Sequence, residues 1–305
     1  MSNEWLKGKI AIVTGSGQGI GRAIAVAMAA QGACVVTNNR TDGAAGGDAR
    51  TTAREIIDDG GRAVPFFGDV SRFDVAERLV RTAVESFGRL DILVNNATVY
   101  VSRPVWEMSE GEWDVCLDAG LKSAFNCTRH AAVLMKEQRS GRIINTTSNA
   151  WHGSLEMCNY AAAKAGIIGL TRAVAMDLGR FGVTCNAFSP AAATRWTVRP
   201  DTLARWEKRL EYGLISREGY EQRVAPLPPP ETVPPLLVYL CSDLAAGING
   251  QIFSIRGNRI AWYPRQADQN AISKEGGQWT VQELAQAVPS KLLAGYRNPA
   301  PVMHD

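Results

Sequence analysis

The sequence predicts a single doubly wound α/β domain, in which a seven-stranded parallel sheet carries helices on both faces. Two observations predict this fold class. Short β-branched apolar runs alternate with longer segments of helical periodicity, which is the pattern of successive βαβ units. The chain has 305 residues, of which 46% are hydrophobic, so it is long enough to bury the core of one large domain. Because crossovers between parallel strands are right-handed, these units wind into one sheet.

Seven short apolar runs are the predicted strands, from "KIAIVT" near the start of the chain to "GQIFSI" near its end. Each is rich in Val, Ile or aromatic residues and has a length typical of a strand buried on both faces. The strands are expected at residues 9–14, 34–38, 63–67, 91–94, 141–146, 183–188 and 250–255.

Helical periodicity fills the intervals between these strands. The last helix carries Pro234 and Pro235 in its first turns, where proline is tolerated. The helices are expected at about residues 19–31, 48–59, 72–87, 109–138, 158–180 and 231–244.

Two segments depart from the alternation. We expect residues 1–260 to form the dinucleotide-binding and catalytic domain, with an excursion over the site at 191–230 that is polar, rich in Arg and Trp, and closed by "APLPPP". Residues 261–305 read as a C-terminal extension. Within it, "TVQE" at 280–283 is a capping-box pattern that opens a short helix, which Pro289 should end.

The bulk composition excludes several classes of function. A net charge of +3 is too small to indicate binding to nucleic acid or to an acidic membrane surface. None of the six cysteines forms a C-x-x-C pair or lies at metal-ligand spacing from a histidine, so we expect buried free thiols and no metal site. The first ten residues, "MSNEWLKGKI", have no apolar run and do not resemble a signal peptide, and no apolar window is long enough to span a bilayer. These features favour a cytoplasmic protein.

A glycine-rich turn follows the first predicted strand. In "GSGQGIG", Gly15, Gly19 and Gly21 precede a helix. Glycines here let the backbone turn tightly and approach a pyrophosphate, which then lies against the positive end of the helix dipole. The spacing is G-x-x-x-G-x-G rather than the six-residue Rossmann fingerprint, and an ordinary strand–helix turn is the alternative. Its place after the first strand of an α/β sheet favours a nucleotide site.

The end of the second strand should meet the adenine ribose of such a cofactor. An acidic residue there would bind the 2′-hydroxyl of NAD, whereas an Arg would bind the 2′-phosphate of NADP. The sequence has Asn39 in the acidic position and Arg40 after it, which favours NADP(H) over NAD(H), unless Arg40 is only a solvated charge. Asp69, after the third strand, is placed to accept a hydrogen bond from the adenine amino group.

Five motifs occur along the chain in a fixed order: "TGSGQGIG" at 14–21, "NNA" at 95–97, Ser148, "YAAAK" at 160–164 and "SP" at 189–190. In the order and spacing of these motifs, over about residues 6–260, the chain resembles the short-chain dehydrogenase/reductase family. The long Gly-rich loop after the second strand, residues 41–48, adds a closer likeness to the (3R)-hydroxyacyl-CoA dehydrogenase module of multifunctional β-oxidation enzymes.

The resemblance implies a catalytic triad of Ser148, Tyr160 and Lys164. Tyr160 and Lys164 are four residues apart, so on a helix their side chains share one face. Tyr160 would act as the acid/base, for which the pKa of its phenol, about 10 when free, must fall by about 3 units. Lys164 would lower that pKa and hold the nicotinamide ribose, and Ser148 would bind the substrate oxygen. Taken singly, each could be a structural residue.

The resemblance also implies a cofactor-binding set and an oligomer. Family members usually form homodimers or homotetramers through their long helices, here 109–138 and 158–180. The residues expected to bind the cofactor are Gly15, Ser16, Gln18, Gly19, Ile20, Gly21, Asn39, Arg40, Asp69, Val70, Asn96, Ala97, Tyr160, Lys164, Pro190 and Ala191.

The sequence departs from the family pattern at four places. Gly120 stands where the family has an active-site Asn that holds a water next to the Lys. "NNAG" becomes "NNAT" with Thr98, and "PG" becomes "PA" with Ala191. The interval from the serine to Tyr160 is one residue short, which makes Thr147 a rival of Ser148.

We therefore expect an NAD(P)(H)-dependent oxidoreductase that interconverts a secondary alcohol and a ketone. The substrate could be a 3-hydroxyacyl thioester (an acyl-CoA) or a ring ketone, contacted by Trp196 and Trp206 of the excursion unless those residues belong to a solvated amphipathic helix. Trp151 and His152 could line the pocket or serve packing. Two alternatives remain open: a non-catalytic dinucleotide-binding sensor or scaffold, and a lyase or dehydratase on the same fold.

Overall fold

The computed structural model divides into two compact units, which we describe separately. The first unit comprises Met1–Arg199 and Pro226–Tyr263, and the second comprises Pro200–Ala225 and Pro264–Asp305. The structure describes residues 4–195, 197, 200–265, 270–276 and 278–295, so the expected contact of Trp196 lies outside the described residues.

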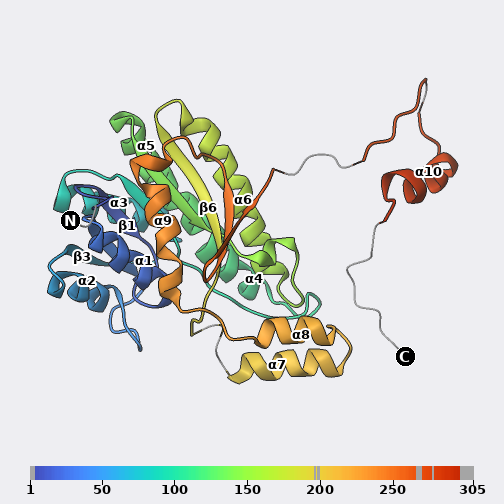
Figure 1. The fold of residues 1–305 in the computed structure, drawn as a ribbon, viewed down its shortest axis with the longest axis horizontal. Helices are drawn as coiled ribbons and strands as arrows, with labels where there is room; N and C mark the ends of the chain where they lie inside the picture. The colour runs from blue at the N-terminus through green and yellow to red at the C-terminus, as the bar shows by residue number, and fades with distance from the viewer. Residues whose placement is uncertain (1–3, 196, 198–199, 266–269, 277, 296–305) are drawn as a thin grey trace. The chain divides into compact units, whose positions relative to one another are not determined.

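A sheet of eight strands, counted over the described residues, forms the centre of the first unit (Figure 1). The order β3-β2-β1-β4-β5-β6-β7-β8 reverses direction between β1 and β4, as a doubly wound sheet requires. All neighbouring pairs are parallel except β7 with β8. The strands are β1 (Ile10–Val13), β2 (Cys34–Asn39), β3 (Arg62–Phe67), β4 (Ile92–Asn95), β5 (Gly141–Thr146), β6 (Val183–Ala191), β7 (Ile252–Arg256) and β8 (Arg259–Tyr263).

The prediction of a purely parallel, seven-stranded sheet is wrong at one edge. β7 is followed by a two-residue hairpin in which Arg256 pairs with Arg259. Gly257 lies at φ 59°, the left-handed region that such tight hairpin turns need and that glycine adopts freely. The Gly-Asn pair between two apolar runs is a known hairpin signal. β8 therefore extends the sheet by an antiparallel strand.

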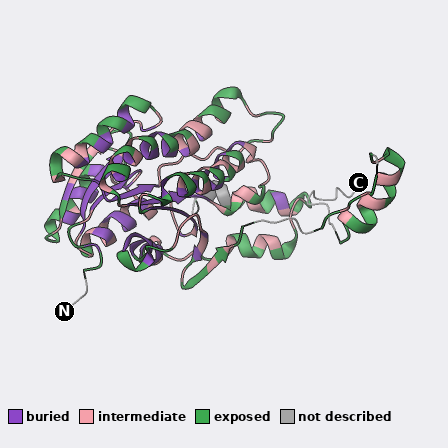
Figure 2. Cartoon of the chain, turned by 90° about the horizontal axis from the view of Figure 1, so that it is seen from above, coloured by how far each residue is buried: buried purple, intermediate pink, exposed green. Residues whose placement is uncertain are grey.

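Helices cover both faces of the sheet. On one face, α1 (Gly19–Ala30), α2 (Ala49–Asp58) and α9 (Pro234–Cys241) bury a common apolar cluster against alternate residues of the strands. On the other face, α3 (Phe73–Phe87), α5 (Ser123–Gln138) and α6 (Cys158–Gly179) bury a second cluster against the remaining strand residues. Figure 2 shows the strands and the inner sides of these helices as the buried part of the chain.

The helix expected over residues 109–138 is interrupted at its middle. α4 (Glu110–Leu117) starts at a capping box formed by Ser109 and Glu112, and a π-helical segment, Asp118–Lys122, joins it to α5. Gly120 is the buried residue of this segment. A π-helical turn inserts one extra residue into the helix and is frequent near functional sites.

The excursion and the C-terminal extension contain helices of their own. α7 (Pro200–Glu211) and α8 (Arg217–Val224) belong to the excursion, where the guanidinium groups of Arg209 and Arg223 lie 4.4 and 5.0 Å from the Trp206 ring centroid. In the extension, the predicted capping box is present at the start of α10 (Val281–Ala287). Pro289 does not end the helical structure, because it lies inside a further π-helical turn, Val288–Leu292.

Two expectations about the chain as a whole can be compared with the structure. All six cysteines are free thiols, as predicted, and Cys158 is the only one that is not fully buried. Among the helices of the described residues, none combines the length and apolar character needed to cross a membrane.

Candidate active site

The glycine-rich turn joins β1 to α1 and is closely packed. Gly15 and Gly19 lie at φ 62° and 53°, where other residues are strained. A side chain on Gly21 would overlap the Gly15 carbonyl, and one on Gly17 would overlap Asn39 and Asp48. α1 begins here without a side-chain cap, which leaves its first amide groups available to an anion.

The Gly-rich loop at residues 41–48 is tied to this turn. Gln18 Nε2 donates hydrogen bonds to the carbonyl oxygens of Ala45 and Gly47, at 2.6 and 2.7 Å. Ser16 is fully buried, and its hydroxyl accepts a hydrogen bond from the Asn38 amide at 2.9 Å. Loop, turn and β2 are thus held together as one surface.

The end of β2 presents a polar atom that lacks a partner. Asn39 Oδ1 is buried and accepts no hydrogen bond. A buried acceptor without a donor is rare in proteins and fits a ligand hydroxyl or amide at this position. Arg40 is exposed and makes no ion pair with any described residue. One oxygen of Asp69, by contrast, already accepts from the Ser71 amide at 3.0 Å.

The "NNA" motif fastens the end of β4 to the end of β1. Asn96 Nδ2 donates to the carbonyl oxygens of Thr14 and Gly15 at 3.0 and 3.1 Å. The amides of Asn96 and Ala97 both donate to the Thr14 hydroxyl, at 2.9 and 3.0 Å. These contacts bring the glycine-rich turn next to the segment after β4, which carries Thr98.

Ser148 and Tyr160 come together from different elements. Ser148 follows β5 and caps the 3₁₀ turn Asn149–His152, while Tyr160 lies in the first turn of α6. The Ser148 hydroxyl lies near enough to the Tyr160 phenol to favour its charged form and so to lower its pKa. The rival Thr147 points elsewhere, because its buried hydroxyl donates to the Lys164 carbonyl at 2.8 Å. Of the two candidates, Ser148 is therefore the one that contacts Tyr160.

Lys164 is among the most buried side chains of the protein, with 1% of its surface exposed. Its Nζ donates to the Thr146 carbonyl at 2.9 Å and lies 5.4 Å from the centroid of the Tyr160 ring. Burial disfavours the charged amine and lowers the pKa of Lys164 to about 8, with a small opposing effect of Cys116.

The pKa of Tyr160 shifts in the direction opposite to the expectation from the sequence. The pKa is raised to about 12, mainly by burial, against an opposing effect of Ser148 and with smaller additional effects of neighbouring Cys116 and Tyr100. The physical reason is that moving the phenolate out of water costs more free energy than its contacts with the protein recover. Without ligands, Tyr160 is therefore a neutral phenol.

Gly120 and Thr98, two of the residues that depart from the family pattern, lie next to each other. A Cβ on residue 120 would lie 3.4 Å from Ala163 Cβ and 3.7 Å from Thr98 Oγ1, so this position has room for a side chain. The third departure, Ala191, ends β6 opposite Arg256 of β7.

Sequence reasoning missed several residues that surround Tyr160 and Ser148. The thiol of Cys116 is buried near both Lys164 and Tyr160, and its position four residues before Gly120 on one helix could have indicated this. Tyr100 packs edge-to-face on Tyr160, with 5.8 Å between the ring centroids. No sequence pattern predicts this contact. Tyr263 of β8 also reaches this region and could not be placed without the hairpin.

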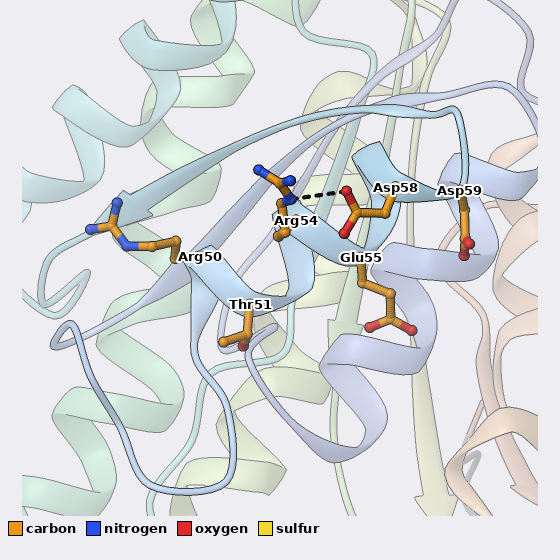
Figure 3. A pocket seen from close by; sticks show the side chains of 6 residues that line it. All are labelled: Arg50, Thr51, Arg54, Glu55, Asp58 and Asp59. Carbon is orange, nitrogen blue, oxygen red and sulfur yellow. Dashed lines mark ion pairs between the residues drawn. The ribbon is translucent and has the colours of Figure 1, made fainter.

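A surface hollow on α2 does not belong to this site. Figure 3 shows that its lining side chains all come from α2 and the residue after it, with Arg54 ion-paired to Asp58 at 2.9 Å. Neither Ser148, Tyr160 nor Lys164 lines it. The group formed by Ser148, Tyr160 and buried Lys164 is thus the better candidate for a reaction centre.

Comparison with known proteins assigns the chain to a family. The sequence profile of the family described as short chain dehydrogenase matches residues 9–203, so the chain belongs to the short-chain dehydrogenase/reductase family. A crystal structure of a short chain dehydrogenase from Mycobacterium avium matches with a TM-score of 0.80 and 36% identity, over 99% of this chain and 100% of that one.

Two curated relatives agree with the closer likeness seen in the sequence. Hydroxyacyl-CoA dehydrogenase ChsB1 of Mycobacterium tuberculosis is 36% identical over 297 residues, which are 92% of this chain and 87% of the relative. Peroxisomal multifunctional enzyme type 2 of Drosophila melanogaster is 34% identical over 299 residues, which are 92% of this chain and 46% of that protein. The protein thus belongs to a family of oxidoreductases, and its relatives include a hydroxyacyl-CoA dehydrogenase.

Proposed function

We propose that the protein is an NAD(P)(H)-dependent oxidoreductase that interconverts a secondary alcohol and a ketone. The observation that carries this proposal is the buried Lys164 amine, 5.4 Å from the centroid of the Tyr160 ring, together with a Ser148 hydroxyl that acts on the pKa of the same phenol. Membership of the dehydrogenase family supports the same reaction class.

The three residues divide the work of moving a proton. In the reductive direction, Ser148 donates a hydrogen bond to the carbonyl oxygen and Tyr160 donates its proton to the alkoxide as it forms. A pKa of about 12 keeps the phenol protonated at neutral pH, ready to act as the acid. In the oxidative direction the phenolate is needed, and a protonated Lys164 beside the ring favours it. The nicotinamide cofactor, when bound, supplies or accepts the hydride.

The residues around the glycine-rich turn would bind this dinucleotide. The uncapped start of α1 suits the pyrophosphate, and the unpaired Asn39 Oδ1 suits a ribose hydroxyl. Arg40 is free to pair with a 2′-phosphate, which favours NADP(H). Lys164 would hold the nicotinamide ribose, and Pro190 and Ala191 would lie along the nicotinamide amide.

The substrate we propose is a 3-hydroxyacyl or 3-oxoacyl thioester. Its support is the name of a relative, a hydroxyacyl-CoA dehydrogenase that is matched over 92% of this chain. We also propose a homodimer or homotetramer through α4–α5 and α6. These helices expose large apolar side chains, with 48% of Phe125 and 74% of Met176 accessible, which supports a partner surface.

The test follows the cofactor absorbance of purified protein against a panel of ketones and 3-oxoacyl-CoA thioesters. We expect turnover with at least one thioester, and a loss of kcat of about 10²- to 10⁴-fold in Tyr160→Phe, because the general acid is removed. Tyr100→Phe, which keeps the neighbouring ring, is the matched control, and both variants should bind the cofactor normally. Cofactor binding without turnover on any substrate would instead identify a sensor or scaffold.

A further inference from the structure

β8 brings one aromatic side chain to the turn that carries Ser148. Tyr263, the last residue of β8, donates a hydrogen bond from its hydroxyl to Asn149 Oδ1 at 2.9 Å. Its ring meets Trp151 edge-to-face, with 5.8 Å between centroids, and lies 5.7 Å from His152. One residue of the added strand therefore contacts the 3₁₀ turn Asn149–His152 near its start and near its end.

The turn is stiffened by its own side chains as well. The rings of Trp151 and His152 stack with 3.6 Å between their centroids, and both rings contact Tyr263. This packing accounts for two residues that the sequence singled out without a role.

Asn149 links this contact to the strand beside the nicotinamide position. Its Oδ1 accepts a second hydrogen bond from Ser189 Oγ at 2.6 Å. Ser189 is fully buried in β6 and directly precedes Pro190. A single amide oxygen thus joins β6, β8 and the residue that follows Ser148.

Ser148 itself has little local support. Within its turn its hydroxyl accepts only a 3.3 Å hydrogen bond from the Ala150 amide, near the upper limit for such a bond. Donors in a reaction centre must be held within about 0.5 Å of the productive geometry by neighbouring groups. The support for Ser148 must therefore come from what fixes its turn.

We propose that Tyr263, acting through Asn149, is a positioning residue for Ser148. This inference rests on the proposed function, in which Ser148 binds the substrate oxygen. Tyr263 and Ser189 fix Asn149 from two strands, and the fixed turn holds the Ser148 hydroxyl against Tyr160. The β7–β8 hairpin is then part of the reaction centre's support, although none of its residues touches Tyr160 in the contacts described.

The test uses Tyr263→Phe, which removes the hydroxyl and keeps the ring contacts. We expect kcat to fall about three- to tenfold, the loss typical of one hydrogen bond, with unchanged cofactor affinity. In a Ser148→Ala background the same change should have less than about a twofold further effect, because both act through one group. Tyr239→Phe, at an exposed tyrosine of α9, is the matched control and should retain full activity.

A second readout separates this inference from the proposed function. Hydrogen exchange of the amides at residues 149–153 should become several-fold faster in Tyr263→Phe and stay unchanged in Tyr239→Phe. Faster exchange in a protein with no turnover would leave the positioning role standing and remove the oxidoreductase function. Unchanged exchange, or equal losses of kcat with and without Ser148, would overturn the positioning role.

Discussion

The proposed cofactor half and the proposed catalytic half of the first unit are built in different ways. Around β1, β2 and β4 the site is made of backbone and short polar side chains, with Asn96 and Thr14 joining the strands through hydrogen bonds. Around α4 and α6 the important groups are titratable side chains whose pKa values are shifted by desolvation, namely the buried Lys164 and Cys116 and the partly buried Tyr160. The first half consists of groups that do not titrate, whereas the pKa values of the second half depend on the surrounding residues.

The difference teaches where the family pattern can vary. In the glycine-rich turn, a side chain on Gly17 or Gly21 would overlap backbone atoms, and Gly15 and Gly19 lie at positive φ, where other residues are strained. Gly120 and Thr98 lie on the catalytic side, where there is space and the electrostatic environment decides the chemistry. Three predictions test this contrast. They concern the buried amine of Lys164, the exposed charge of Arg40 and the missing side chain at Gly120.

The largest effect is expected from the buried amine of Lys164. Its pKa is about 8 in the folded protein and 10.5 when exposed, so between these values the unfolded chain holds more protons. The free energy of unfolding attributable to Lys164 therefore increases with pH through this window, by at most about 1.4 kcal/mol per pH unit. Lys164→Met removes the buried charge, so it should be more stable than the wild type at pH 8, with the advantage shrinking as pH rises.

The measurement is urea unfolding of both proteins at several pH values. The comparison must be a difference, because buried thiols and Tyr160 titrate with raised pKa values and lower the stability of both proteins above about pH 9. A difference that is flat with pH would mean that folding does not lower the pKa of Lys164, and that burial tunes the catalytic half less than we argue.

On the cofactor side, Arg40→Ala should change the choice of cofactor. Loss of a charge-assisted hydrogen bond to a 2′-phosphate should weaken NADP binding about tenfold, while NAD binding changes by less than about twofold. Thermal shift or calorimetry with each cofactor measures this. Arg54→Ala is the control, since Arg54 is exposed on α2 and paired with Asp58. Equal losses for both cofactors would defeat the NADP preference.

The fold could be predicted from the sequence wherever the pattern that indicates an element lies within a few neighbouring residues. β1–β7 were predicted because each centres on a short run of β-branched or aromatic residues between turns, and the capping box before α10 because its spacing is short-range. β8 was missed because the predicted domain boundary at residue 260 falls inside "RIAWY", although its Gly257–Asn258 turn is a hairpin signal.

For the site, the residue types were predictable and the electrostatics were not. The spacing of Tyr160 and Lys164 placed them on one helix face, but the direction of the tyrosine pKa depends on burial by residues from other elements. The contacts of Tyr263 and Tyr100 depend on how strands and loops that are distant in sequence pack together. Local sequence patterns do not predict such packing.

The smallest effect is expected at Gly120, and it addresses the catalytic half most directly. Gly120→Ala should stabilise the protein by about 0.5–1 kcal/mol, because glycine is a poor helix residue and a Cβ there meets only ordinary contacts. Gly120→Asn adds a polar group beside Thr98 and should raise kcat about two- to threefold over Gly120→Ala, if the buried amine of Lys164 lacks a path for protons. Steady-state rates in ordinary and heavy water separate the two contributions, since a proton-transfer limit gives a solvent isotope effect that Gly120→Asn should reduce. Equal values of kcat for the two variants would mean that an amide side chain at residue 120 does not speed proton exchange. Other groups of the catalytic half, such as Thr98, would then carry the proton.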